Sequence, residues 1–161
     1  MDLVESAMKQ AHSKMIEKFE KVNGTIVFDP NVRLPLWEDP EACRQAILEF
    51  IPKANVVKVS DEELEFITGI KDETKAIQSL FKGNVVVVIY TKGPKGAQAF
   101  TKNKFTIEHQ GYKVKAIDTT GAGDAFIGAV ISRILTSDMI DVAQLFENEG
   151  KSILKFGNKV A

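Results

Sequence analysis

The amino-acid sequence predicts an α/β domain with a mainly parallel central sheet covered by helices on both faces. Short apolar runs alternate along the chain with longer segments in which apolar residues recur at every third or fourth position. The short runs are apolar on both faces, as the strands of a covered parallel sheet are. A length of 161 residues is usual for one domain. We therefore expect residues 1–161 to form a single α/β domain.

The expected elements follow one another without an internal boundary. Helices are predicted at Asp2–Val22, Pro40–Ile51, Asp61–Thr68, Asp72–Phe81, Gly121–Ser137 and from Asp141 to about Phe156. Buried strands are predicted at Thr25–Phe28, Asn55–Val59 and Val85–Tyr90. Two further extended segments, Ala97–Thr101 and Lys104–His109, predict a hairpin appended to the parallel sheet. The helix at Gly121–Ser137 is apolar on nearly every side, so we expect it to be buried.

Charge and composition exclude several classes of function. The chain has 21 basic and 22 acidic residues, a formal net charge of −1, so an anionic ligand must be held locally. Its one cysteine, Cys43, cannot form an internal disulfide, and two histidines give no zinc-ligand set. No apolar run approaches the ~20 residues that span a bilayer, and there is no signal-peptide pattern. We expect a cytoplasmic protein that binds neither nucleic acid nor membranes.

A glycine-rich turn before a helix carries the strongest chemical signal. Gly121-Ala-Gly123 lets backbone N–H groups approach an anion at the helix N-terminus, and Asp124 lies in the first turn. Asp124 or Thr120 could instead simply cap this helix. However, Asp118 and the threonines after it supply more polar groups than one cap requires. An anion hole beside a carboxylate suits phosphoryl transfer to a hydroxyl group.

The segment Asp118-Thr-Thr-Gly-Ala-Gly-Asp-Ala-Phe126, followed by Gly128, resembles the second signature of ribokinase-type (PfkB) carbohydrate kinases. The resemblance implies a three-layer ribokinase-like fold and ATP-dependent, Mg²⁺-assisted phosphorylation of a sugar hydroxyl. It makes Asp124 the catalytic base. The anion hole that it implies for the transferred phosphate consists of Gly121, Ala122 and Gly123. It also matches Asp118 and Thr120 with positions that hold a monovalent cation, K⁺, in some members.

Two further stretches agree with the family in order and spacing. Thr91-Lys-Gly-Pro-Lys-Gly96 is similar to the nucleotide loop, and the nucleotide-binding residues implied there are Thr91, Gly93 and Gly96; alone, it could be a plain turn. Lys58-Val-Ser-Asp-Glu-Glu63 resembles the form found in fructokinase-like members. By this resemblance Lys58 and Ser60 bind the nucleotide, and Glu63 organises Mg²⁺ through water. Taken alone, its acidic residues would favour the helix dipole.

The segment Phe28-Asp-Pro-Asn-Val-Arg-Leu-Pro-Leu-Trp37 resembles fructokinases more than ribokinases or adenosine kinases. It places Asn31 and Arg33 on the sugar side, where a guanidinium can pair with phosphate or sugar oxygens. Arg33 could also be an ordinary surface residue. Fructose is therefore the expected substrate, with 2-keto-3-deoxygluconate, ribose or a nucleoside as alternatives. A catalytically silent nucleotide-binding fragment or interaction module is the alternative from a different class.

The resemblance covers essentially the whole chain but only about half of the family's length. The N-terminal half, which in the family supplies the first strands, most sugar contacts and a lid, has no counterpart here. Phe156-Gly-Asn158 resembles the beginning of the final helix, which would place Asn158 near the adenine base. We expect a fragment that needs the N-terminal half, belongs to a homodimer when complete, and alone shows weak nucleotide binding and negligible kinase activity.

Overall fold

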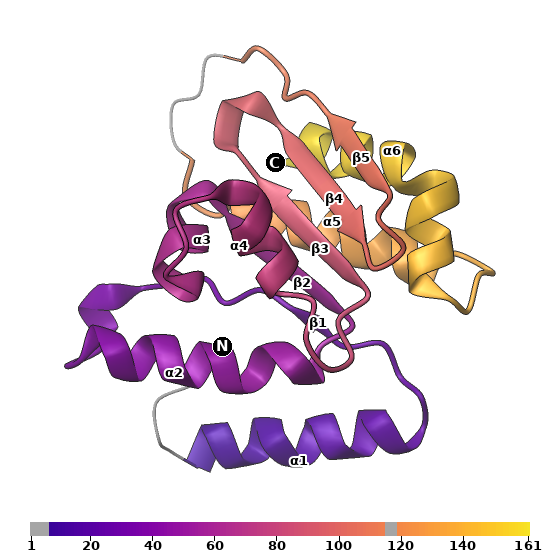
Figure 1. Cartoon of the computed structure of the whole chain (residues 1–161). Coiled ribbons are helices and arrows are strands. Elements are labelled where there is room, and N and C mark those ends of the chain that lie inside the picture. Colours follow the sequence, from indigo (N-terminus) through magenta and orange to yellow (C-terminus); the bar gives the residue numbers. More distant parts are fainter. Residues whose placement is uncertain (1–6, 115–118) are drawn as a thin grey trace.

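The computed structural model describes residues 7–114 and 119–161. They form three layers, in which a mixed sheet lies between two layers of helices (Figure 1). The helices are α1 (Ala7–Lys21), α2 (Pro40–Phe50), α3 (Asp61–Thr68), α4 (Glu73–Ser79), α5 (Ala122–Leu135) and α6 (Val142–Val160). The strands are β1 (Val27–Phe28), β2 (Val56–Ser60), β3 (Val87–Thr91), β4 (Ala97–Thr101) and β5 (Thr106–His109). Short 3₁₀ helices are η1 (Leu34–Leu36), η2 (Ile51–Lys53) and η3 (Gly93–Lys95).

The five strands are arranged in the order in which they occur along the chain, β1-β2-β3-β4-β5. β1, β2 and β3 are parallel to one another, whereas β4 and β5 are added antiparallel. This is the parallel sheet with an appended hairpin that the sequence predicts. Phe28 pairs with Val57, and Ser60 pairs with Thr91. The segment after β1 therefore runs beside the last residues of β2.

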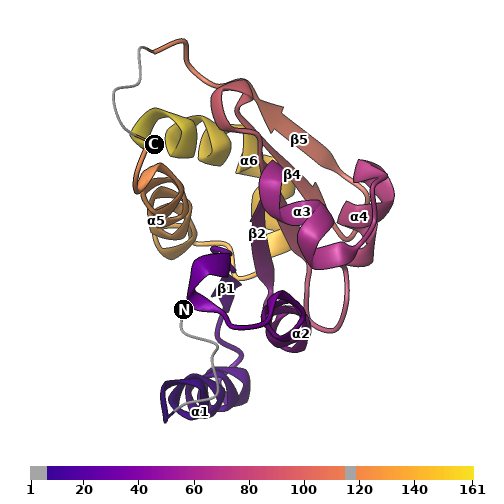
Figure 2. The ribbon, with the colours of Figure 1, turned by 90° about the vertical axis from the view of Figure 1, so that its left-hand side faces the viewer.

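Alternating side chains of the strands divide the core between the two faces of the sheet. Val57, Val59 and Val88 pack with the side chains of α2, α3 and α4, whereas Val56 and Val87 pack with those of α5 and α6. Figure 2 shows the sheet between these two helical layers. Because neighbouring residues of a strand point to opposite faces, a strand buried on both sides is apolar at nearly every position, with the buried Lys58 of β2 as an exception. Each apolar run is explained by this double burial.

Most element boundaries agree with the sequence to within a few residues, and α3 agrees at both ends. The strand predicted at Val85–Tyr90 begins two residues later in the structure, at Val87. Val85 lies in a turn, where its N–H donates to the Lys82 carbonyl. Val85 is nevertheless fully buried. Its apolar character reflects burial and not pairing in the ladder.

Two expectations about the C-terminal helices are wrong. The helix at Gly121–Ser137 was expected to be buried, but α5 buries only Phe126, Ala129 and Val130 and leaves Leu135 exposed, because it is covered on one side. No new helix begins at Phe156. This residue lies inside α6, which continues unbroken to Val160 although it contains Gly150 and Gly157, both of which are buried.

One edge of the sheet and the helix before it carry exposed apolar surface. β1 is two residues long and is the edge strand of the described sheet. Met15, Phe19 and Val22, on and just after α1, are exposed. An exposed edge and uncovered apolar surface are what the sequence predicts for half of a larger sheet. None of the described helices is both long and apolar enough to cross a membrane.

Candidate active site

The predicted site residues gather where the three parallel strands end. Asn31 follows β1, Ser60 ends β2, and Thr91 ends β3. In open α/β sheets the carboxyl ends of parallel strands form the usual ligand-binding edge. The parallel register brings these three segments to the same edge, although they are far apart in the sequence.

Asp124 meets the segment after β1 at the first turn of α5. Asn31 Nδ2 donates a hydrogen bond to Asp124 Oδ1 across 3.4 Å. Asn31 adopts a positive φ of 44°, a conformation that asparagine tolerates better than most residues. The Asp124 side chain is otherwise exposed. This carboxylate is held by one neutral amide and can reach a ligand from the open side.

The N-terminus of α5 is capped by a glycine and has no side-chain cap. Gly121 is the N-cap residue, with a φ of 81°, so neither Asp124 nor Thr120 occupies the capping position. Asp39, Asp72 and Asp141 cap α2, α4 and α6 through their side chains, which a glycine cannot do. No described atom lies within 4 Å of a Cβ built at Gly121. Helix N-termini commonly hold anions, but Ala122 N already donates to Thr119 O at 3.1 Å, so this N–H must give up that bond before it can bind one.

A buried ion pair lies next to this turn. Lys58 Nζ is 3.1 Å from Asp29 Oδ2 and donates a hydrogen bond to Oδ1 at 3.2 Å. Lys58 points toward the α5 face of β2 because Val57 and Val59 take the opposite face. A Cβ built at Gly123 would be 3.4 Å from Lys58 Nζ. Burial raises the pKa of Asp29, and the neighbouring Lys58 ammonium opposes that increase.

Asp29 did not appear among the predicted site residues. Its position directly after an apolar strand is a signal that could have identified it. However, the same signal marks many solvated residues at strand ends. Only the pairing of Phe28 with Val57 shows that the next residue lies beside Lys58.

Glu63 connects the segments that follow β1 and β2. Its Oε1 accepts from the Val32 N–H at 2.7 Å, and its Oε2 accepts from Ser60 N at 2.9 Å and Ser60 Oγ at 2.8 Å. Both carboxylate oxygens therefore already have protein donors. Oε1 keeps one lone-pair site for water, whereas Ser60 occupies both sites of Oε2. A contact with the metal through water is what the resemblance implies. The carboxylate also closes the first turn of α3, as a capping residue does.

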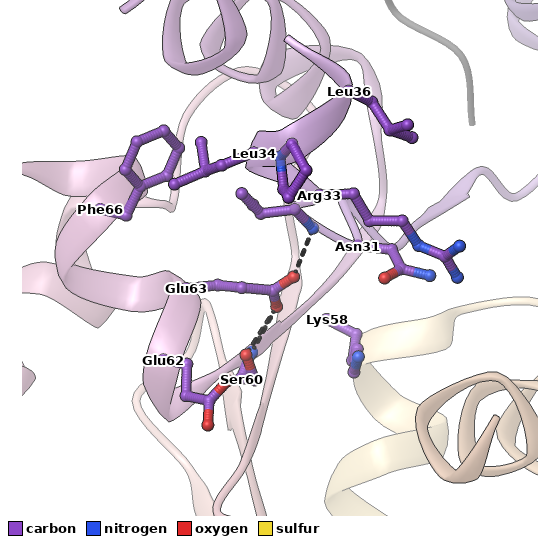
Figure 3. Close-up of a pocket in the computed structure, with 11 residues that line it drawn as sticks. Asn31, Arg33, Leu34, Leu36, Lys58, Ser60, Glu62, Glu63 and Phe66 are labelled. Atoms are coloured by element: carbon purple, nitrogen blue, oxygen red, sulfur yellow. Dashed lines mark hydrogen bonds between the residues drawn. The ribbon is translucent and has the colours of Figure 1, made fainter. Parts of the chain in front are cut away.

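A pocket of about 730 Å³ lies beside these segments. Its lining residues are Asn31, Val32, Arg33, Leu34, Pro35, Leu36, Lys58, Ser60, Glu62, Glu63 and Phe66. Figure 3 shows Glu62 and Glu63 on one side of the pocket, with Asn31, Arg33 and Lys58 on the other. The pocket thus presents two cations opposite two carboxylates. Such a lining suits a polar ligand.

The predicted nucleotide loop connects β3 to the hairpin. Gly93 needs its glycine for a φ of 51°, whereas Gly96, at φ 97°, is also in close contact with the backbone at His109 and Gly111. Thr91 Oγ1 donates to Val59 O at 3.5 Å. The turn alternative therefore accounts for both glycines. It does not exclude phosphate contact by the loop.

Glu73, at the start of α4, accepts two hydrogen bonds from residues at the end of β3. Its Oε2 accepts from Tyr90 Oη at 3.0 Å, and its Oε1 accepts from Lys92 Nζ at 2.8 Å. The hydrogen bond from Lys92 lowers the pKa of Glu73. Burial, followed by this carboxylate, raises the pKa of Tyr90 to about 12. Glu73 was not among the predicted site residues, because it resembles any acidic residue in a first helical turn.

The remaining predicted residues lie elsewhere or cannot be placed. Asn158 Nδ2 donates to His109 O at 3.0 Å, so its amide joins α6 to the end of β5. Thr120 directly precedes Gly121 and is exposed. Asp118 lies outside the described residues. Across residues 7–114 and 119–161, no group of three or more His, Cys, Asp or Glu side chains could hold a metal ion.

Comparisons with known proteins identify the family and the fold of this chain. The family described as pfkB family carbohydrate kinase matches residues 2–161. Fructokinase-2 of Zea mays is 37% identical over 161 residues, which are 98% of this chain and 46% of that protein. The chain therefore spans about half the length of the curated relatives that it matches.

Solved structures show the same fold. A double mutant of fructokinase from Vibrio cholerae O395, bound to fructose, ADP and potassium ion, has a TM-score of 0.85 and 30% identity, over 97% of this chain and 49% of that one. A proposed ribokinase II from E. coli, in complex with ATP and Mg²⁺, has a TM-score of 0.79 and 27% identity, over 97% and 47%. With a family match over nearly its whole length and a ribokinase-like fold, the chain belongs to the pfkB family of carbohydrate kinases.

Proposed function

We propose that this chain forms the nucleotide-binding and catalytic-base half of an ATP-dependent sugar kinase whose acceptor is fructose. The observation that carries the proposal is the position of Asp124. Its carboxylate lies in the first turn of a glycine-capped helix and accepts from Asn31, and a Cβ built at the preceding Gly123 would be 3.4 Å from the Lys58 ammonium. A base next to an electropositive anion site is what phosphoryl transfer to a hydroxyl needs.

In this proposal Asp124 accepts the proton of the attacking sugar hydroxyl. Asn31 keeps the carboxylate oriented through its amide N–H, which adds no charge. The backbone N–H groups of Gly121, Ala122 and Gly123 stabilise the charge on the transferred phosphoryl group. Since glycine side chains do not obstruct this turn, a phosphate oxygen can approach the backbone closely.

The nucleotide would lie across the ends of β2 and β3. Thr91, Gly93 and Gly96 line its phosphates, Lys58 and Ser60 bind from β2, and Asn158 lies on the adenine side. Bound Mg²⁺ would neutralise phosphate charge, and a site held mainly by nucleotide oxygens and water is its usual environment in kinases. Glu63 fits an outer role, because both of its oxygens accept protein hydrogen bonds and Oε1 keeps a lone-pair site for water.

A monovalent cation, K⁺, would be held by Asp118 and Thr120 in the same turn. Support comes from the family resemblance of the segment and from the potassium ion in the Vibrio cholerae structure. Because K⁺ needs oxygen ligands, a carboxylate and a hydroxyl are suitable donors at these positions. The exposed position of Thr120 leaves it accessible to such an ion.

Fructose is preferred to other acceptors for two reasons. The segment from Phe28 to Trp37 resembles fructokinases, and Arg33 lines the open pocket together with Asn31. The fructokinase of Zea mays is also among the similar relatives. Ribose, 2-keto-3-deoxygluconate or a nucleoside remain alternative acceptors that the same catalytic base could serve.

A nucleotide-binding module without kinase activity is the second candidate. It is favoured by the exposure of Asp124, because phosphoryl transfer needs water to be excluded from the reacting groups. The chain matches about half of its relatives' length, so shielding groups could come from the other half.

The deciding experiment is a coupled assay of ADP release with MgATP and a panel of sugars. We would test the chain alone and a chimera in which it replaces the matching half of the Vibrio cholerae fructokinase. The proposal predicts fructose-dependent turnover by the chimera and almost none by the chain alone. A folded chimera that binds MgATP without turning over any sugar would support the silent module instead.

A further inference from the structure

Lys58 occupies an unusual electrostatic position. Only 6% of this residue is exposed, yet it also lines the open pocket. Its ammonium is near the position of a Gly123 Cβ, in the first turn of α5. The N-terminus of a helix carries a partial positive charge, so a cation there is repelled. The buried carboxylate of Asp29 offsets this repulsion.

The ion pair itself is not optimal. Lys58 donates from β2 to Asp29, directly after β1, at 3.1 and 3.2 Å from the two oxygens. Nevertheless, the pKa of Asp29 is raised: burial is the largest cause, Lys58 opposes it, and the negative charge of Glu63 adds to the increase. Burying both charges therefore costs free energy that their attraction does not fully return. A purely structural link between two strands would cost less free energy if it were made by apolar side chains.

We propose that Asp29 is a positioning residue, which holds the Lys58 ammonium where it can bind a phosphate in the first turn of α5. This inference rests on the function proposed above. An ammonium has three N–H donors, and two of them account for the contacts with the Asp29 carboxylate. When a phosphoryl group enters the first turn of α5, Lys58 donates a hydrogen bond to one of its oxygens and keeps Asp29 as its second partner.

The alternative is that the pair only connects β1 to β2. The two roles predict opposite effects of Asp29→Asn. If Asp29 positions a phosphate-binding cation, the asparagine oxygen still accepts from Lys58 while a negative charge near the anion is lost. Binding of a polyphosphate should then be as tight as before or tighter. If the pair is only structural, Asp29→Asn and Lys58→Met should weaken binding alike.

The test is isothermal titration of this chain with MgATP and with inorganic tripolyphosphate. We expect Lys58→Met to lower the affinity for both by at least tenfold, because charge-assisted hydrogen bonds are the strong ones. Lys58→Arg should recover part of the loss. The matched control is Lys53→Met. Lys53 lies in η2, before β2 begins, and is ion-paired with Glu49 of α2. Circular dichroism melting checks that each variant is folded.

The outcomes separate this inference from the proposed function. If the unmodified chain binds neither MgATP nor tripolyphosphate, the proposed function and this inference both fail. If it binds them and Lys58→Met binds equally well, only the role of Lys58 is wrong. Equal weakening by Asp29→Asn and Lys58→Met overturns the positioning role in favour of the structural link. A tenfold loss in Lys58→Met and a loss in Asp29→Ala, with no loss in Asp29→Asn, supports the inference, because the asparagine oxygen still accepts from Lys58 and alanine has no acceptor. Affinity unchanged in Asp29→Ala overturns it.

Discussion

Asn31 donates a hydrogen bond to Asp124 across 3.4 Å, although the two residues are 93 positions apart in the sequence. The contact joins the end of β1 to the first turn of α5. It gives the proposed catalytic base a fixed neighbour that contributes no charge. The geometry of the proposed reaction therefore depends on a long-range contact between the segment after β1 and the first turn of α5.

Asp124→Asn in the chimera should abolish phosphoryl transfer while MgATP affinity changes by no more than a few-fold. The amide cannot accept the hydroxyl proton, whereas the backbone N–H groups of α5 remain. Coupled assay of ADP release and isothermal titration measure the two effects. Substantial remaining turnover would remove Asp124 from the role of base.

Asn31→Ala in the chimera should lower kcat by about tenfold with little change in the KM for ATP, because it releases Asp124 without removing it. The control is Asn23→Ala. Asn23 has a similar positive φ, 52° compared with 44°, but lies beside α1. An equal loss of kcat in both variants would assign the effect to backbone strain instead.

Gly123→Val should weaken MgATP binding by at least tenfold. Its Cβ would be 3.4 Å from Lys58 Nζ, and its methyl groups would block approach to the α5 amides. Gly128→Val in the same helix is the matched control, because no described atom lies within 4 Å of its Cβ. Isothermal titration compares the two. Similar affinities in both variants would contradict the anion-hole assignment.

Glu63→Gln should lower the free energy of unfolding by about 1 kcal/mol. The amide end of glutamine would replace an acceptor facing Ser60 or Val32, leaving an N–H donor in its place. Glu62→Gln, at an exposed neighbouring position, should have little effect. Urea denaturation measures both. A stability equal to that of the unmodified chain would show that the bonds to Glu63 contribute nothing.

Tyr90 should ionise well above the ordinary tyrosine range. Burial, followed by the Glu73 carboxylate, raises its pKa from 10.0 to about 12. Because the folded pKa is the higher one, its contribution to stability is fully present below pH 10 and is lost as the pH rises through 12.

Ultraviolet absorbance of phenolate in a Tyr112→Phe background measures this ionisation, with circular dichroism confirming the fold. Adding Glu73→Gln should lower the midpoint, since the carboxylate charge and its effect on Tyr90 are removed. The midpoint should still exceed 10, because burial is the largest cause. A midpoint that does not respond to Glu73→Gln would contradict the bond between the two side chains.

Local patterns in the sequence were sufficient for the elements and for the position of Asp124. The bounds of α3 follow from its acidic start at Asp61 and the glycine after Thr68, which adopts the left-handed conformation typical of a helix end. The glycine turn before α5 likewise appears directly in the sequence. These features depend on neighbours along the chain, so a single sequence contains the information that they need.

What the sequence determined alone is therefore the order of strands and helices, the two-sided burial of the sheet and the glycine-rich start of α5. Only the tertiary structure decided that Asp29 pairs with Lys58 and that Glu63 binds Val32. It also decided that α5 is covered on one face only. The physical reason is that periodicity records which side of an element is apolar, whereas side-chain partners depend on the register and packing of segments distant in the chain.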